Sequence, residues 1–147
     1  MLAEIRQALA AALVARVGDV MQVSAYVLSS PNPPTITVFP ASTQYDLAMA
    51  NTFSTMGTTR AGTDKWVFTV RAYVAEMNDV GAQQLLDRFL EPSGGLSVKE
   101  AIEVDGSLGG LVDDASVVSM SGYTQYQIDG VTGPVLGAEW SVEVLAG

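Results

Sequence analysis

The sequence contains no cysteine and no histidine among its 147 residues. Without cysteine the chain forms no disulfide and offers neither a thiolate nucleophile nor a cysteine metal ligand. Without histidine it lacks the commonest general base at neutral pH and the commonest metal ligand in proteins. The two absences exclude serine–histidine–aspartate triads and most zinc sites. We therefore expect a protein that is not an enzyme and that holds neither a cofactor nor a metal ion.

Basic residues and long apolar runs are also scarce. Seven Lys and Arg stand against sixteen Asp and Glu, which gives a formal net charge of −9. Proteins that bind duplex DNA need clustered basic residues, and seven scattered ones do not provide them. The longest apolar stretch, Ala8 to Ala15, is far shorter than the ~20 residues of a membrane span. Because Glu4 and Arg6 interrupt the N-terminus, we expect no export signal there and no membrane partner.

The acidic residues are concentrated in the middle of the chain. Residues 1–75 carry four acids and five bases, a formal +1, whereas residues 76–114 carry nine acids and two bases, a formal −7. Residues 115–147 add three acids and no base. Between positions 91 and 114, Lys99 is the one base beside six acids, namely Glu91, Glu100, Glu103, Asp105, Asp113 and Asp114. We expect this segment to face water or a like-charged polymer, because gathering such charge elsewhere is costly.

Three stretches have helical periodicity or capping signals. The stripe Leu2, Ile5, Leu9, Ala12, Leu13 and Val17 predicts an N-terminal helix that stops at Gly18. A second apolar stripe, Ala82, Leu85, Leu86, Phe89 and Leu90, predicts a helix capped by Asn78 or Asp79. Ser97-Val98-Lys99-Glu100 has the capping-box pattern, which predicts a short helix from Ser97 to about Val104.

Alternating apolar residues predict the strands. The runs 21–27 and 35–39 flank the turn 31–34 and suggest a hairpin. Residues 64–77 are apolar on both faces, which predicts a central strand covered on both sides. Val118, Met120, Tyr126 and Ile128 are predicted to share one face of a later strand, and Leu136, Ala138, Trp140, Val142 and Val144 one face of the last. The predicted order is α-β-β-long loop-β-α-α-β-β. It describes one domain over 1–147, an α+β fold with a mostly antiparallel sheet flanked by helices.

The predicted loop at 41–63 is the strongest candidate for a contact surface. It is small and polar with scattered large apolar side chains, and loops of such length are usually functional or disordered. The whole chain is 48% hydrophobic and only 16% charged, against about 25% charged in typical domains. Large weakly polar surfaces of this kind mark interaction sites. We expect the loop to be mobile in a free subunit and to order against a partner through Tyr45, Met49, Phe53, Met56, Arg60 and Lys65.

The acidic residues offer only weak signals for chemistry. Asp113 and Asp114 are adjacent, so on a strand their carboxylates point to opposite faces. Glu100 and Glu103 share a helix face near Asp105, but no ordered calcium loop surrounds them. Glycosidase-type carboxylate pairs are usually lined by aromatic residues, and only 7% of the chain is aromatic. A solvated acidic surface is the favoured interpretation, and a carboxylate- or metal-dependent enzyme is the distant alternative.

Five stretches of the chain resemble a known family in order and texture. They are residues 5–9 in the first helix, 35–40 with the closing Pro40, 66–74 in the long strand, 83–90 in the second helix and 97–101 at the short helix. The likeness covers most of the chain, although each stretch alone is unspecific. In this order they resemble the tail terminator (tail completion) proteins of long-tailed bacteriophages.

The resemblance implies a structural virion protein. Such a protein forms a homo-oligomeric ring, usually a hexamer, that caps the tail tube, ends its growth and joins it to the head-side connector. Its implied partners are itself, the tail tube protein and the connector or neck protein, while DNA passes through without specific binding. Its implied location is the head-proximal end of the tail, after synthesis in the host cytoplasm. Another neck or head-completion protein of the same particle is the alternative, and a free-standing binding domain is less favoured.

Overall fold

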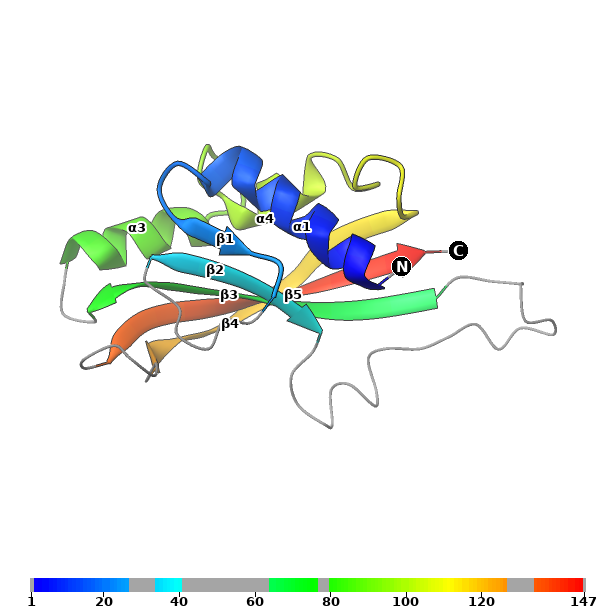
Figure 1. The fold of residues 1–147 in the computed structure, drawn as a ribbon. Coiled ribbons are helices and arrows are strands. Elements are labelled where there is room, and N and C mark those ends of the chain that lie inside the picture. The colour runs from blue at the N-terminus through cyan, green and yellow to red at the C-terminus, as the bar shows by residue number, and fades with distance from the viewer. Residues whose placement is uncertain (1, 27–33, 41–63, 77–79, 127–133, 147) are drawn as a thin grey trace.

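The computed structural model describes residues 2–26, 34–40, 64–76, 80–126 and 134–146. The elements are helix α1 (Leu2–Val17), strands β1 (Gln22–Ser24), β2 (Thr35–Pro40) and β3 (Asp64–Glu76), helices α3 (Val80–Leu90) and α4 (Val98–Glu103), and strands β4 (Asp114–Tyr126) and β5 (Val135–Ala146). The strands form one sheet in the order β1-β2-β3-β5-β4. The predicted α+β class with a mostly antiparallel sheet is confirmed (Figure 1).

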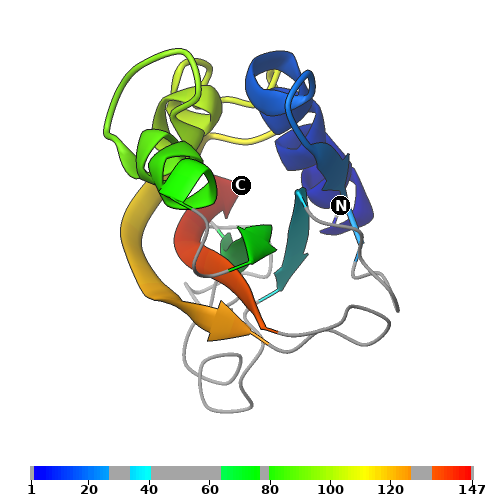
Figure 2. The same ribbon diagram turned by 90° about the vertical axis from the view of Figure 1, so that its left-hand side faces the viewer.

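The described helices all lie on the same face of the sheet, α1 towards the β1 edge and α3 and α4 towards the β4 edge (Figure 2). The core fills the space between these two layers. On the helix side, Ile5, Leu9, Leu13 and Val17 of α1 are fully buried, as their spacing predicts. The helix ends at Val17, directly before Gly18 as predicted, and glycine fits there because an added Cβ would lie 2.5 Å from the Val14 carbonyl oxygen. Burying these side chains stabilises the fold by roughly 1.5–3 kcal/mol each.

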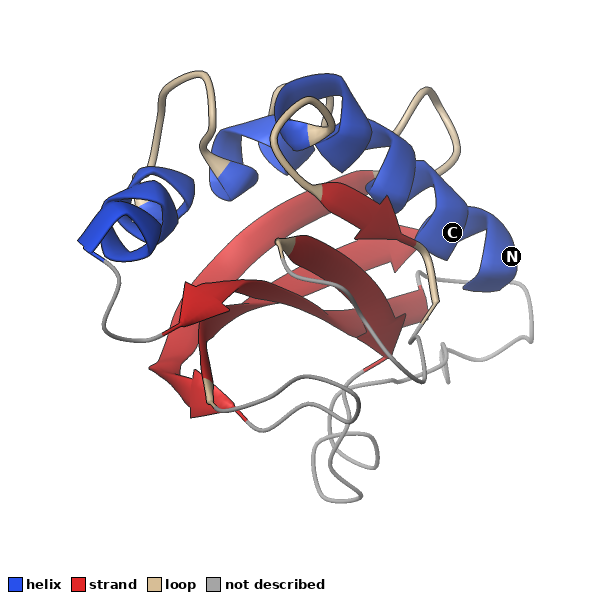
Figure 3. Ribbon diagram, turned by 60° about the vertical axis from the view of Figure 1, so that its left-hand side comes forward, coloured by secondary structure: helices blue, strands red, loops and turns tan. Residues whose placement is uncertain are grey.

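The two long central strands confirm the predicted alternation. In β5 the predicted face from Leu136 to Val144 is buried at all five positions. In β3, Phe68, Val70, Ala72 and Val74 are buried against the helices. The strand was predicted to be covered on both sides; among the described residues the helices cover one face, while the second face carries half-buried side chains (Figure 3). That second face also carries an ion pair between Arg71 and Glu139.

The predicted hairpin between residues 21–27 and 35–39 is wrong. Strand β1 has only three residues and pairs with β2 in parallel, with Gln22 opposite Thr35 and Ser24 opposite Thr37. The chain between the two strands, residues 25–34, is much longer than a tight turn. That length lets the chain travel back and enter β2 from the same end as β1, whereas a hairpin needs only a short loop. Periodicity reports which face a strand buries and not the direction of its neighbour.

Strand β4 forms the free edge opposite β1 and departs from simple alternation. Its register with β5 shifts between Val117 and Ser119 and again between Ser121 and Thr124, near Gly122 with φ +68°. Each shift inserts one extra residue, which turns the following side chains to the other face. Met120 therefore lies opposite Trp140, while Tyr126 lies on the second face. The prediction that these two residues share a face is wrong for this reason, and Ile128 lies outside the described residues.

Candidate functional site

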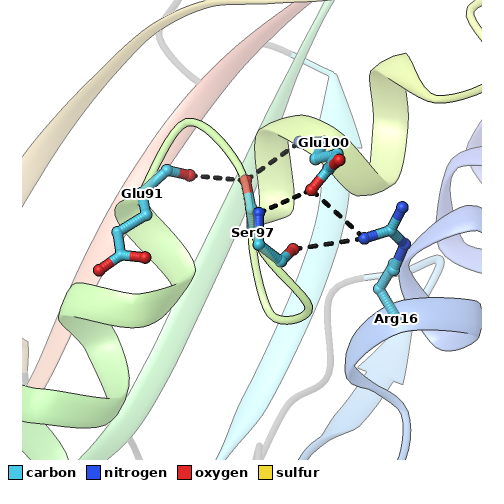
Figure 4. Close-up of polar contacts among 5 residues, drawn as sticks. Arg16, Glu91, Ser97 and Glu100 are labelled. Atoms are coloured by element: carbon cyan, nitrogen blue, oxygen red, sulfur yellow. Dashed lines mark hydrogen bonds and ion pairs between the residues drawn. The ribbon is translucent and has the colours of Figure 1, made fainter.

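The acidic segment from Glu91 to Asp114 begins with a tight polar junction between α3, α4 and α1. The Ser97 hydroxyl accepts from the Glu100 backbone N–H at 3.1 Å, so Ser97 caps α4 as predicted. The second half of the capping box does not form. The Glu100 carboxylate instead accepts from the Gly94 N–H at 2.7 Å and pairs with Arg16 of α1 at 3.4 Å (Figure 4). The loop before Ser97 folds back, which gives Glu100 nearer donors than the Ser97 N–H.

Glu103 joins α4 to the free edge strand. One of its carboxylate oxygens accepts from the Val117 backbone N–H at 2.8 Å, and the other pairs with Lys99 one turn earlier. Partial burial disfavours the charged form, but the Lys99 ammonium and the Val117 N–H outweigh it and hold the pKa of Glu103 below its usual value. The Glu103 side chain therefore links α4 to β4 and stabilises the contact between them.

The other acids of the segment are exposed. Glu91, Asp113 and Asp114 are exposed, and so is Asp105. Asp105 accepts from Ser107 Oγ at 2.7 Å and from the Gly109 N–H at 2.9 Å, and these bonds lower its pKa. Its carboxylate thus holds a turn in which non-glycine residue Leu108 has φ +50°. Of the six predicted acids, four are exposed, and the other two, Glu100 and Glu103, form ion pairs within the subunit.

The acids do not assemble into a metal centre in the described part of the chain. No group of three or more acidic side chains among the described residues is placed to hold a metal ion. Asp113 and Asp114 precede and open β4, while Glu100 is paired with Arg16 and Glu103 with Lys99. No described helix has the length and apolar character that crossing a bilayer requires.

The predicted contact loop at 41–63 lies outside the described residues. Tyr45, Met49, Phe53, Met56 and Arg60 belong to it. Lys65 lies at the start of β3, where its backbone pairs with Leu145 of β5, and its side chain is also outside the description. The loop therefore remains a prediction, and the described fold fixes its two ends at neighbouring strands β2 and β3.

A polar cluster on the second face of the sheet was not anticipated from the sequence. Arg71 of β3 forms a hydrogen-bonded ion pair with Glu139 of β5, its direct cross-strand partner. The Arg71 guanidinium also lies 5.3 Å from the Tyr126 ring centre, and Tyr126 meets Tyr73 edge to face. Burial opposes the charge, but Glu139 and the Tyr73 hydroxyl raise the pKa of Arg71. Four polar residues on three strands give no shared periodicity, so only the sheet register reveals this cluster.

An apolar groove separates α1 from α4 and the turn after it. It encloses about 420 Å³, and its lining is mainly alanine from α1 together with Val104 and Leu108. Val104 is 66% exposed at the end of α4. The charged residues in its lining are Arg16, which pairs with Glu100, and Asp105, which accepts from the Ser107 hydroxyl and the Gly109 N–H. The groove has the character of a packing surface and not of a substrate pocket.

Large exposed apolar side chains gather at both edges of the sheet. Eight such residues are strongly exposed within the described residues, and six form two groups. We define the β1 rim as Val14 of α1, Val20 before β1 and Tyr26 after it, and the β4 rim as Val118, Met120 and Tyr123 of β4. The rims are at opposite edges because β1 and β4 are the outermost strands (Figure 2). The large exposed apolar side chains of the described residues thus form two separate groups, one near each edge strand.

No family model matches the chain, and no curated protein matches it significantly. What bears on function is therefore the fold and the surfaces described above.

Proposed function

We propose that this chain is a structural virion protein of a long-tailed bacteriophage. It forms a ring that caps the tail tube, ends tube growth and joins the tube to the head-side connector. The observation that carries the proposal is the element order. Each stretch on which the resemblance to tail terminators rests lies in an element of the expected type: residues 5–9 in α1, 35–40 in β2, 66–74 in β3, 83–90 in α3 and 97–101 at the start of α4. Two long strands then follow, as in the family.

The surface supports an assembly role over a catalytic one. Within the described residues, apolar side chains are exposed at both sheet edges, and the acids are either exposed singly or engaged by bases and backbone N–H groups. A ring needs two different complementary surfaces on each subunit, and the chain has two apolar rims. A catalytic carboxylate needs a pocket with convergent groups.

The exposed acids have a role in such a ring. Glu91, Asp105, Asp113 and Asp114 are exposed, and we place them at the channel or its rim. A negatively charged lining repels DNA phosphates, so the DNA slides through without binding. An outer-wall position for these residues, with a neutral or basic channel, would contradict this part of the proposal.

Tail tubes provide the direct test. Tubes assembled from the tube protein of the same virus are incubated with the chain and examined by electron microscopy. The expected result is a ring at one end of each tube and no further elongation when more tube protein is added. Continued growth with no chain at the tube ends would overturn the proposal. Finding the chain in virions next to the portal, and not on the tube, would favour the alternative of a neck or head-completion protein.

A further inference from the structure

We infer that copies of this chain meet head to tail, with the β4 rim of one copy against the β1 rim of the next. The inference rests on the proposed ring and adds which two surfaces meet. Val20 and Tyr26 of the β1 rim and all three residues of the β4 rim belong to uncharged stretches: residues 20–26 and residues 115–126 contain no acidic or basic residue. Two copies that each carry a net charge of −9 repel each other, so close contact is least costly where charge is absent.

The distribution of charge selects the pairing. Residues 1–76, which end with β3, carry five acids and five bases, a formal charge of zero, whereas residues 77–147 carry eleven acids and two bases, a formal −9. The fold sends these halves to different sides of the sheet: β1, β2 and β3 come from the first half, and β5 and β4 from the second. A β4-to-β4 contact would bring two strongly acidic sides together. A β4-to-β1 contact brings an acidic side against one with no net charge, which avoids this repulsion and favours the head-to-tail arrangement.

Individual residues near the rims agree with this pairing. At the β1 rim, the Arg6 guanidinium lies 4.3 Å from the Tyr26 ring centre and donates to the Ala25 carbonyl at 2.8 Å. At the β4 rim, the Tyr123 hydroxyl lies 3.3 Å from the Asp87 carboxylate. Each rim thus pairs an exposed tyrosine with one charge, positive on the β1 side and negative on the β4 side. Facing each other, the two rims present opposite charges around an apolar centre, as in protein interfaces with a polar border.

The β4 edge also lacks most of the features that protect free edges. Residues 115–126 contain no lysine and no proline, which are common protective residues. The Val117 N–H is occupied by Glu103, so the available portion begins at Val118, where the exposed apolar residues start. The register shifts on either side of Ser119 and Ser121 twist this portion. We therefore expect side chains of the β4 rim to carry the contact, with at most a short stretch of backbone pairing.

Cysteine cross-linking tests the pairing directly, because the chain has no native cysteine. Three variants are made: Val118→Cys, Val20→Cys and the double variant. Each is treated with a short bismaleimide, both alone at high concentration and on tail tubes. Head-to-tail contact gives covalent multimers larger than dimers from the double variant. It gives only monomers from each single variant, because each then carries a reactive group on just one of the two rims.

A charge inserted at the β4 rim provides the second readout. Met120 is 49% exposed, and Met120→Glu would bury an unpaired carboxylate in the contact, which we expect to weaken association roughly 100-fold or more. The matched control is Val80→Glu, because Val80 is exposed at the start of α3 and lies outside both rims. Circular dichroism of both variants checks that the fold is retained.

The outcomes separate this inference from the proposed function. Dimers from Val118→Cys alone would show a β4-to-β4 contact and overturn the inference. Rings that form normally with Met120→Glu, or a double variant that forms rings without cross-linking, would also overturn it and leave the proposed ring intact. Absence of rings from the unaltered chain, even on tubes, would overturn the proposed function as well.

Discussion

Removing the carboxylate of Glu103 tests how the acidic helix α4 is fixed to the exposed strand. Glu103→Ala deletes the bond from the Val117 N–H at 2.8 Å and the ion pair with Lys99. A hydrogen bond to a charged group contributes about 1.5–3 kcal/mol. The Glu103 side chain is 29% exposed, and water partly replaces the lost partner, so we expect a loss of about 1–2 kcal/mol in the free energy of unfolding. For a domain near this size, that lowers Tm by roughly 2–8 °C.

The assay is urea denaturation followed by tryptophan fluorescence, because Trp66 and Trp140 both lie in the sheet against the core. Glu91→Ala is the matched control, since it removes the same charge from an exposed side chain, and we expect it to change stability by less than ~0.5 kcal/mol. Lys99→Ala tests which bond dominates. Lys99 is 41% exposed, and such pairs contribute only about 0.2–1 kcal/mol, so most of the Glu103→Ala effect should persist in the Lys99→Ala background.

Acid provides an independent check on the same residue. Because the folded-state pKa of Glu103 lies below its unfolded value, its charged form stabilises the fold above the unfolded pKa. That contribution is lost as the pH falls from about 4.5 through the folded pKa. The stability difference between the parent chain and Glu103→Ala should therefore shrink over this interval. Equal stability of the two proteins at pH 7, or a difference that grows on acidification, would show that the Glu103 carboxylate does not stabilise the contact between α4 and β4.

Two further predictions concern the sheet and the acidic surface. Gly137→Ala places a Cβ 2.5 Å from the Ala72 carbonyl oxygen and 3.0 Å from the Tyr126 ring, so we expect a loss of about 1–3 kcal/mol in urea denaturation. Gly95→Ala, with no atom within 4 Å of the added Cβ, should change stability by less than ~0.5 kcal/mol, and equal effects of the two changes would contradict the packing argument. Asp113→Asn and Asp114→Asn alter exposed carboxylates and should leave stability and ring assembly within a few-fold of normal in a sedimentation assay. If either abolished function while assembly stayed intact, a catalytic or metal-binding role would have to be reconsidered.

Local sequence patterns were sufficient for most elements because each one records how a segment meets a single core. The stripe from Ile5 to Val17 and the alternation from Leu136 to Val144 each describe one face, and both faces are buried as predicted. Ser97 caps α4 because its hydroxyl reaches a backbone N–H three residues away, a contact that needs no distant partner. The α+β class and the absence of cysteine and histidine were likewise properties of the sequence alone.

The tertiary structure decided everything that depends on which distant segments become neighbours. The parallel pairing of β1 with β2, the flip of Tyr126 by an extra residue in β4 and the diversion of Glu100 to Gly94 and Arg16 each follow from contacts across the fold. The same holds for the Arg71–Glu139 pair and for the two rims. The composition, 48% hydrophobic and 16% charged, predicted large weakly polar surfaces. Only the order of strands in the sheet places the exposed apolar residues at opposite edges, because strand order is set by long-range pairing and not by any local pattern.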